Sequence, residues 1–170
     1  MAEHRSGEVA GRIAAFLDAH HVMSLATCGP HGAHAANLFY ARDGFSLVWL
    51  SDSQARHSVA LADNARVSAT VASDCRDFHD ICGVQISGTA HRVDDAAARH
   101  CALTLLETRY PFLQHVAEHS AVERAYQAAE VYRLAAHRIV IIDNTRGFGH
   151  KDVLDLRLAI GASIPLMHKL

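Results

Sequence analysis

The sequence lacks any apolar run that approaches the roughly 20 residues of a membrane-spanning helix, and it has only three prolines among 170 residues. Half of the residues are hydrophobic and 20% are charged, which is typical of a globular chain and not of a disordered one. The formal net charge of −2 gives the whole chain no electrostatic attraction for nucleic acid or for an anionic membrane. The length fits one domain over residues 1–170, with a core over about residues 22–158.

Cysteine pairs and export signals are also missing. The four cysteines form no CxxC pair, so we interpret them as reduced thiols and expect Cys82 and Cys101 to be buried. The N-terminal segment mixes acids with bases and has no clear cleavage site. We therefore expect a cytoplasmic protein.

The familiar catalytic and metal-binding motifs are absent. There is no HExxH motif, serine nucleophile elbow or pair of acids at catalytic spacing, and no cysteine shows local signs of activation. Histidine is abundant, with 14 residues, but His31 and His34 sit in a Gly/Pro turn without other ligands. We interpret the histidines as solvated side chains, predict no metal site and assign no catalytic residue.

Hydrophobic periodicity predicts a mainly β chain with flanking helices. Short connections between strands require antiparallel pairing, and six strands of this length usually close into a barrel. The expected elements, in order, are a helix at 7–20, strands at 22–27, 33–41 and 45–49, a helix at 54–62, strands at 66–71 and 81–93, a helix capped by Asp94-Asp95 and broken at Pro111, a helical piece at 113–129, a strand at 131–144 and a possible closing strand at 152–158.

The turn from Ser51 to His57 has the residues of a phosphate site. A strand ends there, Ser51-Asp52-Ser53 offers helix caps, and the free amides of a helix start attract anions. Arg56 adds a forked donor, and His57 adds a donor that is charged in part near neutral pH. An ordinary capped surface helix with a solvated Arg-His pair explains the same pattern.

Two amides lie in apolar strands. Gln85 is costly to bury without partners, and an amide that faces a ligand both donates and accepts. Asn37 shares a strand face with small residues, which leaves room for a flat molecule. The alternatives are a solvent-facing Gln85 on an edge strand and, for Asn37, a face that packs against a helix.

The loop from Asn144 to Lys151 combines two glycines with three basic side chains around one aromatic ring. This composition suits a phosphate clamp or a ring-stacking loop, with Asn144 and Lys151 as candidate contacts. A basic surface loop is the other reading.

Three motifs together resemble the FMN-binding split-barrel superfamily, the pyridoxamine 5'-phosphate oxidase-like proteins. They are LVWLSDSQARHSVALADNARVSATV, the GVQISG strand and the DNTRGFGHK loop, and the last two resemble a small bacterial subfamily. The resemblance implies a six-stranded antiparallel split β-barrel and a homodimer with two FMN sites in the subunit interface.

By position, the resemblance places Arg56 and His57 on the FMN phosphate and Ser51 near it. It places Gln85 beside the isoalloxazine and residues 144–151 near a segment that crosses the dimer. Ala35 and Tyr40 stand where the oxidases have basic phosphate ligands, so we do not expect vitamin B6 oxidase activity.

The sequence therefore predicts an FMN-binding protein, an oxidoreductase in the broad sense, of unknown substrate and electron donor. One alternative is a haem-binding or haem-degrading split barrel, with His137, His150 or His168 as axial ligand. Another is a non-enzymatic flavin-binding stress protein. A deazaflavin in place of FMN stays open.

Overall fold

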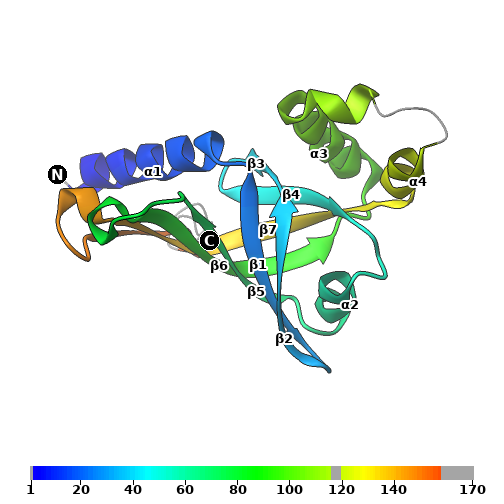
Figure 1. Cartoon of the computed structure of the whole chain (residues 1–170), viewed down its shortest axis with the longest axis horizontal. Coiled ribbons are helices and arrows are strands. Elements are labelled where there is room, and N and C mark those ends of the chain that lie inside the picture. The colour runs from blue at the N-terminus through cyan, green and yellow to red at the C-terminus, as the bar shows by residue number, and fades with distance from the viewer. Residues whose placement is uncertain (1, 116–119, 158–170) are drawn as a thin grey trace, which may run out of the picture.

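The computed structural model describes residues 2–115 and 120–157, which form one curled antiparallel sheet with helices around it (Figure 1). The sheet runs in the order β2-β1-β5-β6-β7-β4-β3, and β8 pairs with β7. The elements are α1 (Ala2–Ala19), β1 (Val22–Gly29), β2 (Gly32–Phe39), β3 (Ala41–Asp43), β4 (Ser46–Ser51), α2 (Arg56–Asp63), β5 (Arg66–Ala72), β6 (Cys82–Arg92), α3 (Ala96–Arg109), α4 (Ala121–Ala128), β7 (Glu130–Asp143) and β8 (Lys151–Asp155), with short 3-10 helices η1 (Phe78–Asp80), η2 (Pro111–His115) and η3 (Asn144–Arg146).

The antiparallel split-barrel architecture is confirmed, with eight described strands where six were expected. The segment predicted as one strand at 33–41 divides into β2 and β3 around Tyr40, whose hydroxyl donates to the Leu17 carbonyl at 2.7 Å. The closing strand forms as β8, which pairs with residues 138–142 of β7. β2, at one end of the sheet, approaches β4, next to the other end, without pairing with it, so the barrel is open along that line.

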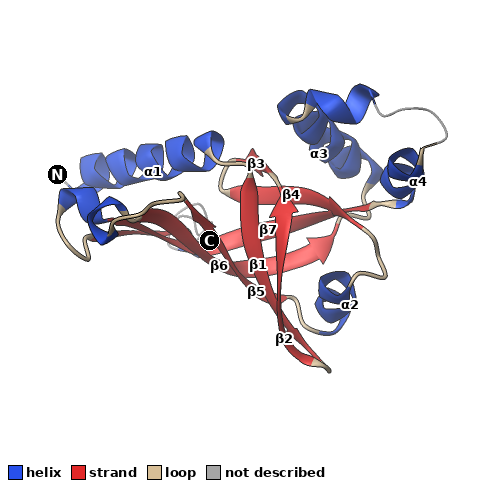
Figure 2. Ribbon diagram, in the orientation of Figure 1, coloured by secondary structure: helices blue, strands red, loops and turns tan. Residues whose placement is uncertain are grey.

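The core lies inside the curl, where every second residue of the strands points inward. α1 covers one side of this core with a helical stripe of apolar residues, and the helices as a whole lie along the side and at the ends of the sheet (Figure 2). The buried members include Val9, Ile13, Leu17, Met23, Leu25, Trp49, Ile86, Leu134 and Ile139. None of the helices in the described ranges has the length and hydropathy of a membrane span.

α3 packs on the sheet through one narrow stripe of residues. Ala102 and Leu106 are buried, whereas Cys101 is exposed and Cys82 is only partly buried, so the expectation of two buried thiols is wrong. The cause is that α3 packs only against a small second core at β3, β4 and the start of β7, which takes in one narrow stripe of the helix. The predicted cap holds, because the Asp95 carboxylate accepts from Ala98 N at 2.8 Å.

The helical piece expected at 113–129 is shorter than predicted. It consists of η2 and α4, and the residues between them lie outside the described part of the chain. The apolar tail beyond Gly161, with His168, also lies outside the described residues.

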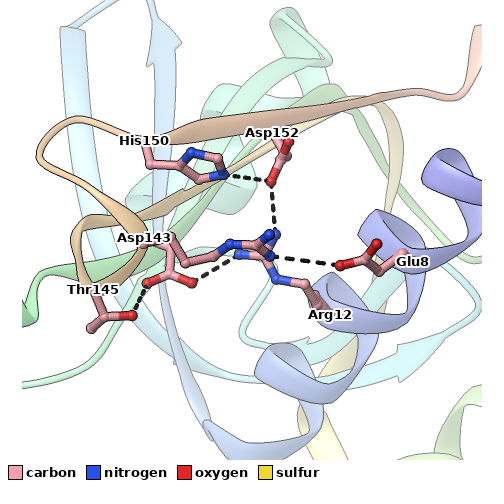
Figure 3. A network of polar contacts seen from close by, with 7 residues as sticks. Glu8, Arg12, Asp143, Thr145, His150 and Asp152 are labelled. Carbon is pink, nitrogen blue, oxygen red and sulfur yellow. Dashed lines mark hydrogen bonds and ion pairs between the residues drawn. The ribbon is translucent and has the colours of Figure 1, made fainter.

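An ion-pair network joins α1 to the β7–β8 hairpin (Figure 3). The Arg12 guanidinium donates to the carboxylates of Asp152 at 2.7 Å and Asp143 at 2.8 Å. His150 Nε2 lies 2.9 Å from Asp152, and the Thr145 hydroxyl donates to Asp143 at 2.6 Å. Because α1 also carries part of the core, this network fixes the helix on the sheet at a point about 130 residues away along the chain.

Candidate functional site

The start of α2 carries no side-chain cap. Its N-cap residue is Ala55, and the expectation that Ser51-Asp52-Ser53 caps the helix is wrong. The Asp52 side chain instead accepts from Gln54 N at 2.8 Å, in a turn closed by a hydrogen bond from Ala55 N to Asp52 O. The first amides of a helix have no partner within the helix. Without a capping side chain, these donors are available to an anion.

Arg56, the first residue of α2, lies in a groove of about 260 Å³ between this helix and the β1–β2 turn. Its guanidinium donates to the His31 carbonyl at 3.0 Å, which leaves further N–H donors directed elsewhere. Gly29 permits the close approach of turn and helix, because a Cβ at this position would lie 2.9 Å from the Cβ of Ala60. The guanidinium is therefore held at a cleft by the fold.

His57 is buried, with only 7% of its surface exposed, and is paired inside the site. Its Nε2 lies 2.6 Å from the Ser51 hydroxyl, which also accepts from Ser58 at 3.3 Å. Burial, with a smaller contribution from the charge of His34, lowers the pKa of His57 below its ordinary value of 6.5. Burial therefore reduces the charged fraction of His57 near neutral pH below that of a solvated histidine. The Ser51 hydroxyl also donates to the Asp52 carbonyl, over a long 3.4 Å, so its proton is directed within the turn.

Sequence reasoning missed His34, which lines the same groove. Its ring lies parallel to that of His57, with 6.5 Å between the centroids. The His31-x-x-His34 spacing is a signal for this residue, but from the sequence we interpret both histidines as solvated side chains in a turn. Among the described residues, no group of three or more His, Cys, Asp or Glu side chains is arranged to hold a metal ion.

Asn37 and Gln85 belong to a second location, a polar row across the outer face of the sheet. Direct pairing runs from Asn37 to Ser24, Thr70 and Gln85 on β2, β1, β5 and β6. The Ser24 hydroxyl donates to the Asn37 amide oxygen at 2.6 Å. Gln85 is exposed on a central strand and not on an edge. Three strand spacings, about 14 Å, separate the two amides.

Asn144 and Lys151 form a third location, at the end of the sheet beside α1 (Figure 1). The Asn144 amide is engaged within the fold, since it donates to the Phe78 carbonyl at 2.6 Å and accepts from Gly149 N at 3.0 Å. It thereby joins the two loops that carry Phe78 and Phe148. Within one chain, the structure thus brings together Ser51, Arg56 and His57, and it leaves the other four candidates elsewhere.

Comparison with known proteins places this geometry in context. A family model described as pyridoxamine 5'-phosphate oxidase matches residues 9–142. A UPF0306 protein of Serratia proteamaculans is 30% identical over 149 residues, which cover 82% of this chain and 90% of that protein.

Solved structures share the fold at lower identity. The heme binding protein of Mycobacterium smegmatis superposes with a TM-score of 0.66 at 21% identity, over 88% of this chain and 57% of that one. The General Stress Protein 26 of Bacillus anthracis superposes with a TM-score of 0.61 at 14% identity, over 87% of this chain and 98% of that one. At these identities, the likeness concerns the fold alone.

Proposed function

The chain belongs to the pyridoxamine 5'-phosphate oxidase family, and from this premise we propose that it binds FMN and acts as a flavin-dependent oxidoreductase. The observation that carries the proposal is the position of Arg56 at an uncapped helix start, inside a groove. A guanidinium and free helix amides are the donors that a phosphate needs. FMN supplies the hydride and electron chemistry, and the protein binds and orients it.

The donors beside Arg56 fit a phosphate. The Ser51 hydroxyl is held in place by His57 and Ser58, and its own donor contact, 3.4 Å to the Asp52 carbonyl, is a long one that a phosphate oxygen can replace. His57 contributes by orienting Ser51 more than by its charge, because burial lowers its pKa. We infer that phosphate affinity changes little between pH 7 and pH 9, where no donor of this set loses a proton.

We further propose a homodimer with the flavin site at the subunit interface. In one chain, Gln85 lies on the outer sheet face, away from the groove of Arg56. A second copy that packs on this face supplies its own Gln85 to the ring of a flavin held by Arg56. Light scattering is expected to give about twice the 18.5 kDa of one chain, and a monomer at micromolar concentration would rule out a shared site.

Flavin titration followed by fluorescence tests the phosphate site. Arg56→Ala is expected to weaken FMN binding by roughly 1.5–3 kcal/mol and to leave riboflavin binding unchanged. Arg76→Ala removes the same charge from an exposed position in the loop before β6 and serves as the matched control. A protein that binds no FMN, or a variant that loses FMN and riboflavin equally, contradicts the proposal.

Haem is the second candidate, on the strength of His137. This side chain lines a groove of about 700 Å³ on the outer sheet face, and its only described contact is a long one, 3.5 Å from Nε2 to the Thr89 hydroxyl. His150, by contrast, is paired with Asp152. Haemin that produces an absorption band at about 400 nm, lost in His137→Ala, favours haem.

Stable FMN binding without reduction by NADPH favours a non-enzymatic flavoprotein.

A further inference from the structure

We propose that the groove on the outer face of the sheet binds a pyrophosphate-bearing small molecule, at a site separate from Arg56. This groove, which we call the arginine groove, is defined by Arg66, Arg138 and Arg157 around a volume of about 700 Å³. The arginine groove uses none of the residues beside α2, but it lies on the same sheet face as the proposed subunit contact, next to the Thr70–Gln85 pair. The proposal therefore requires that the second copy leave this part of the face open.

Small side chains form the floor of the arginine groove. Residues of this size on four neighbouring strands leave the volume open and let a ligand approach the strand backbones. They are Ala26, Cys28, Ala33, Ser68, Ser87, Gly88 and Thr89. The hydroxyls among them supply donors and acceptors without adding charge.

A β-bulge directs two consecutive side chains of β7 into the groove. Ser87 pairs with Arg138, whereas Gly88 pairs with Ala136, so His137 is the extra residue. Both His137 and Arg138 line the groove as a result. The bulge requires glycine, because a Cβ at position 88 would clash with the Ala135 carbonyl oxygen. Bulges of this kind redirect side chains next to functional sites.

The positive charge of the groove is largely uncompensated. Within residues 2–115 and 120–157, the guanidinium groups of Arg66 and Arg138 form no hydrogen bond or close ion pair, although Arg138 pairs in register with Asp155 and its charge helps to lower the pKa of that carboxyl. Arg157 is paired with Asp155 at 3.2 Å. Three cations thus face one carboxylate, in a chain whose net charge is −2. Like charges gathered around a groove raise the local concentration of anions there.

The spacing of the two unpaired arginines favours a ligand with more than one anionic group. Arg66 is on β5 and Arg138 is on β7, with β6 between them, and Arg66 lies two residues along the strand from the row that contains Arg138. Two strand spacings and this offset place the two backbone positions about 12 Å apart. Ser68 and Ser87 pair directly with each other in the row that leads to Arg138. Two guanidinium forks with hydroxyls between them suit a pyrophosphate, which each fork contacts through two oxygens.

Calorimetric titration of the full chain with inorganic pyrophosphate at low salt tests this proposal. The double variant Arg66→Ala/Arg138→Ala is expected to weaken pyrophosphate binding by at least about tenfold. Arg66→Lys/Arg138→Lys keeps the charge, removes the forks and is expected to give an intermediate loss. Both variants should stay close to the wild-type melting transition, because in the described part of the chain neither guanidinium forms a hydrogen bond and Arg138 only attracts Asp155 across β7 and β8.

Two controls separate this site from the proposed flavin site. Arg56→Ala and Arg76→Ala are each expected to bind pyrophosphate as the wild type does, and the arginine-groove variants are expected to bind FMN within about twofold of the wild type. The proposal is overturned if pyrophosphate does not bind at millimolar concentration, or if all four variants lose affinity equally. It is also overturned if the wild type does not bind pyrophosphate and the arginine-groove variants no longer bind haemin.

Discussion

The hydroxyl oxygen of Ser51 lies 2.6 Å from Nε2 of His57. The two residues are the last of β4 and the second of α2, so the contact closes the turn that presents Arg56. His57 belongs to the buried interior of this turn and Arg56 to its open groove, although they are adjacent in the sequence.

Burial of His57 makes the stability of the protein sensitive to pH. Burial lowers the pKa of His57 below 6.5, so the unfolded state binds the proton more readily than the folded state. The stabilising contribution is complete above about pH 6.5 and is lost as the pH falls through the window below it. In urea unfolding between pH 7 and pH 5, His57→Gln should show a smaller loss of stability than the wild type. The exposed control His91→Gln should keep the wild-type slope, and identical slopes for all three proteins would contradict the prediction.

Gly88→Ala tests the bulge between β6 and β7. The new Cβ meets the carbonyl of Ala135, which belongs to the backbone and yields only if the strands shift. We expect a loss of about 1–3 kcal/mol in the free energy of unfolding. Gly7→Ala, in α1 with open space around the new methyl, should instead add up to about 1 kcal/mol. A Gly88→Ala variant as stable as the wild type would show that the strands tolerate the extra atom.

Arg12→Gln tests the network between α1 and the β7–β8 hairpin. The variant removes two charged hydrogen bonds, and we expect it to cost about 1–2 kcal/mol. Arg133→Gln, which breaks an exposed pair with Asp43, should cost less than about 1 kcal/mol. Chemical unfolding of both variants at pH 7 measures the difference in the free energy of unfolding. Equal losses would show that the Arg12 ion pairs stabilise the protein no more than the exposed pair of Arg133 and Asp43 does.

The same network predicts that the protein loses stability at acid pH. Hydrogen bonds from Thr145 and Arg12 lower the pKa of Asp143, and those from His150 and Arg12 lower the pKa of Asp152. The stability that these carboxylates provide is present above their ordinary pKa of 3.8 and is lost as the pH falls below it. Arg12→Gln should lose part of this acid dependence, which melting curves between pH 5 and pH 3 would reveal.

Thr27→Val is expected to stabilise the protein. Thr27 is only 3% exposed, and its hydroxyl oxygen has no hydrogen-bond partner in the described part of the chain. Valine keeps the β-branched shape and removes the unpaired polar atom, so a gain of about 1 kcal/mol follows. Thr70→Val, on the exposed face of the neighbouring strand, should change stability by less than about 0.5 kcal/mol. A less stable Thr27→Val protein would indicate that the hydroxyl binds a partner such as water.

Much of the fold is predictable because the strands alternate in residue type. The period of two in β5 and β6 identifies the inward face correctly, and Asp95 and Pro111 mark the limits of α3. The cap of α2 is not predictable in the same way, since Asp52 turns back to its own loop and Ala55 takes the cap position. Local propensity allows Asp52 either to cap α2 or to bond within its own loop. Packing of α2 against the β1–β2 turn selects the bond within the loop.

The sequence by itself determined the antiparallel split barrel, the membership of the family and the position of Arg56 at the start of a helix, because these depend on short-range pattern. Only the tertiary structure decided that burial lowers the pKa of His57, that Asn144 is engaged between two loops, and that Arg66 and Arg138 share a groove. The protonation of His57 depends on burial, and the groove depends on which strands pair and where a bulge shifts their register. Such relations join residues far apart in the chain, and they arise only when the sheet closes.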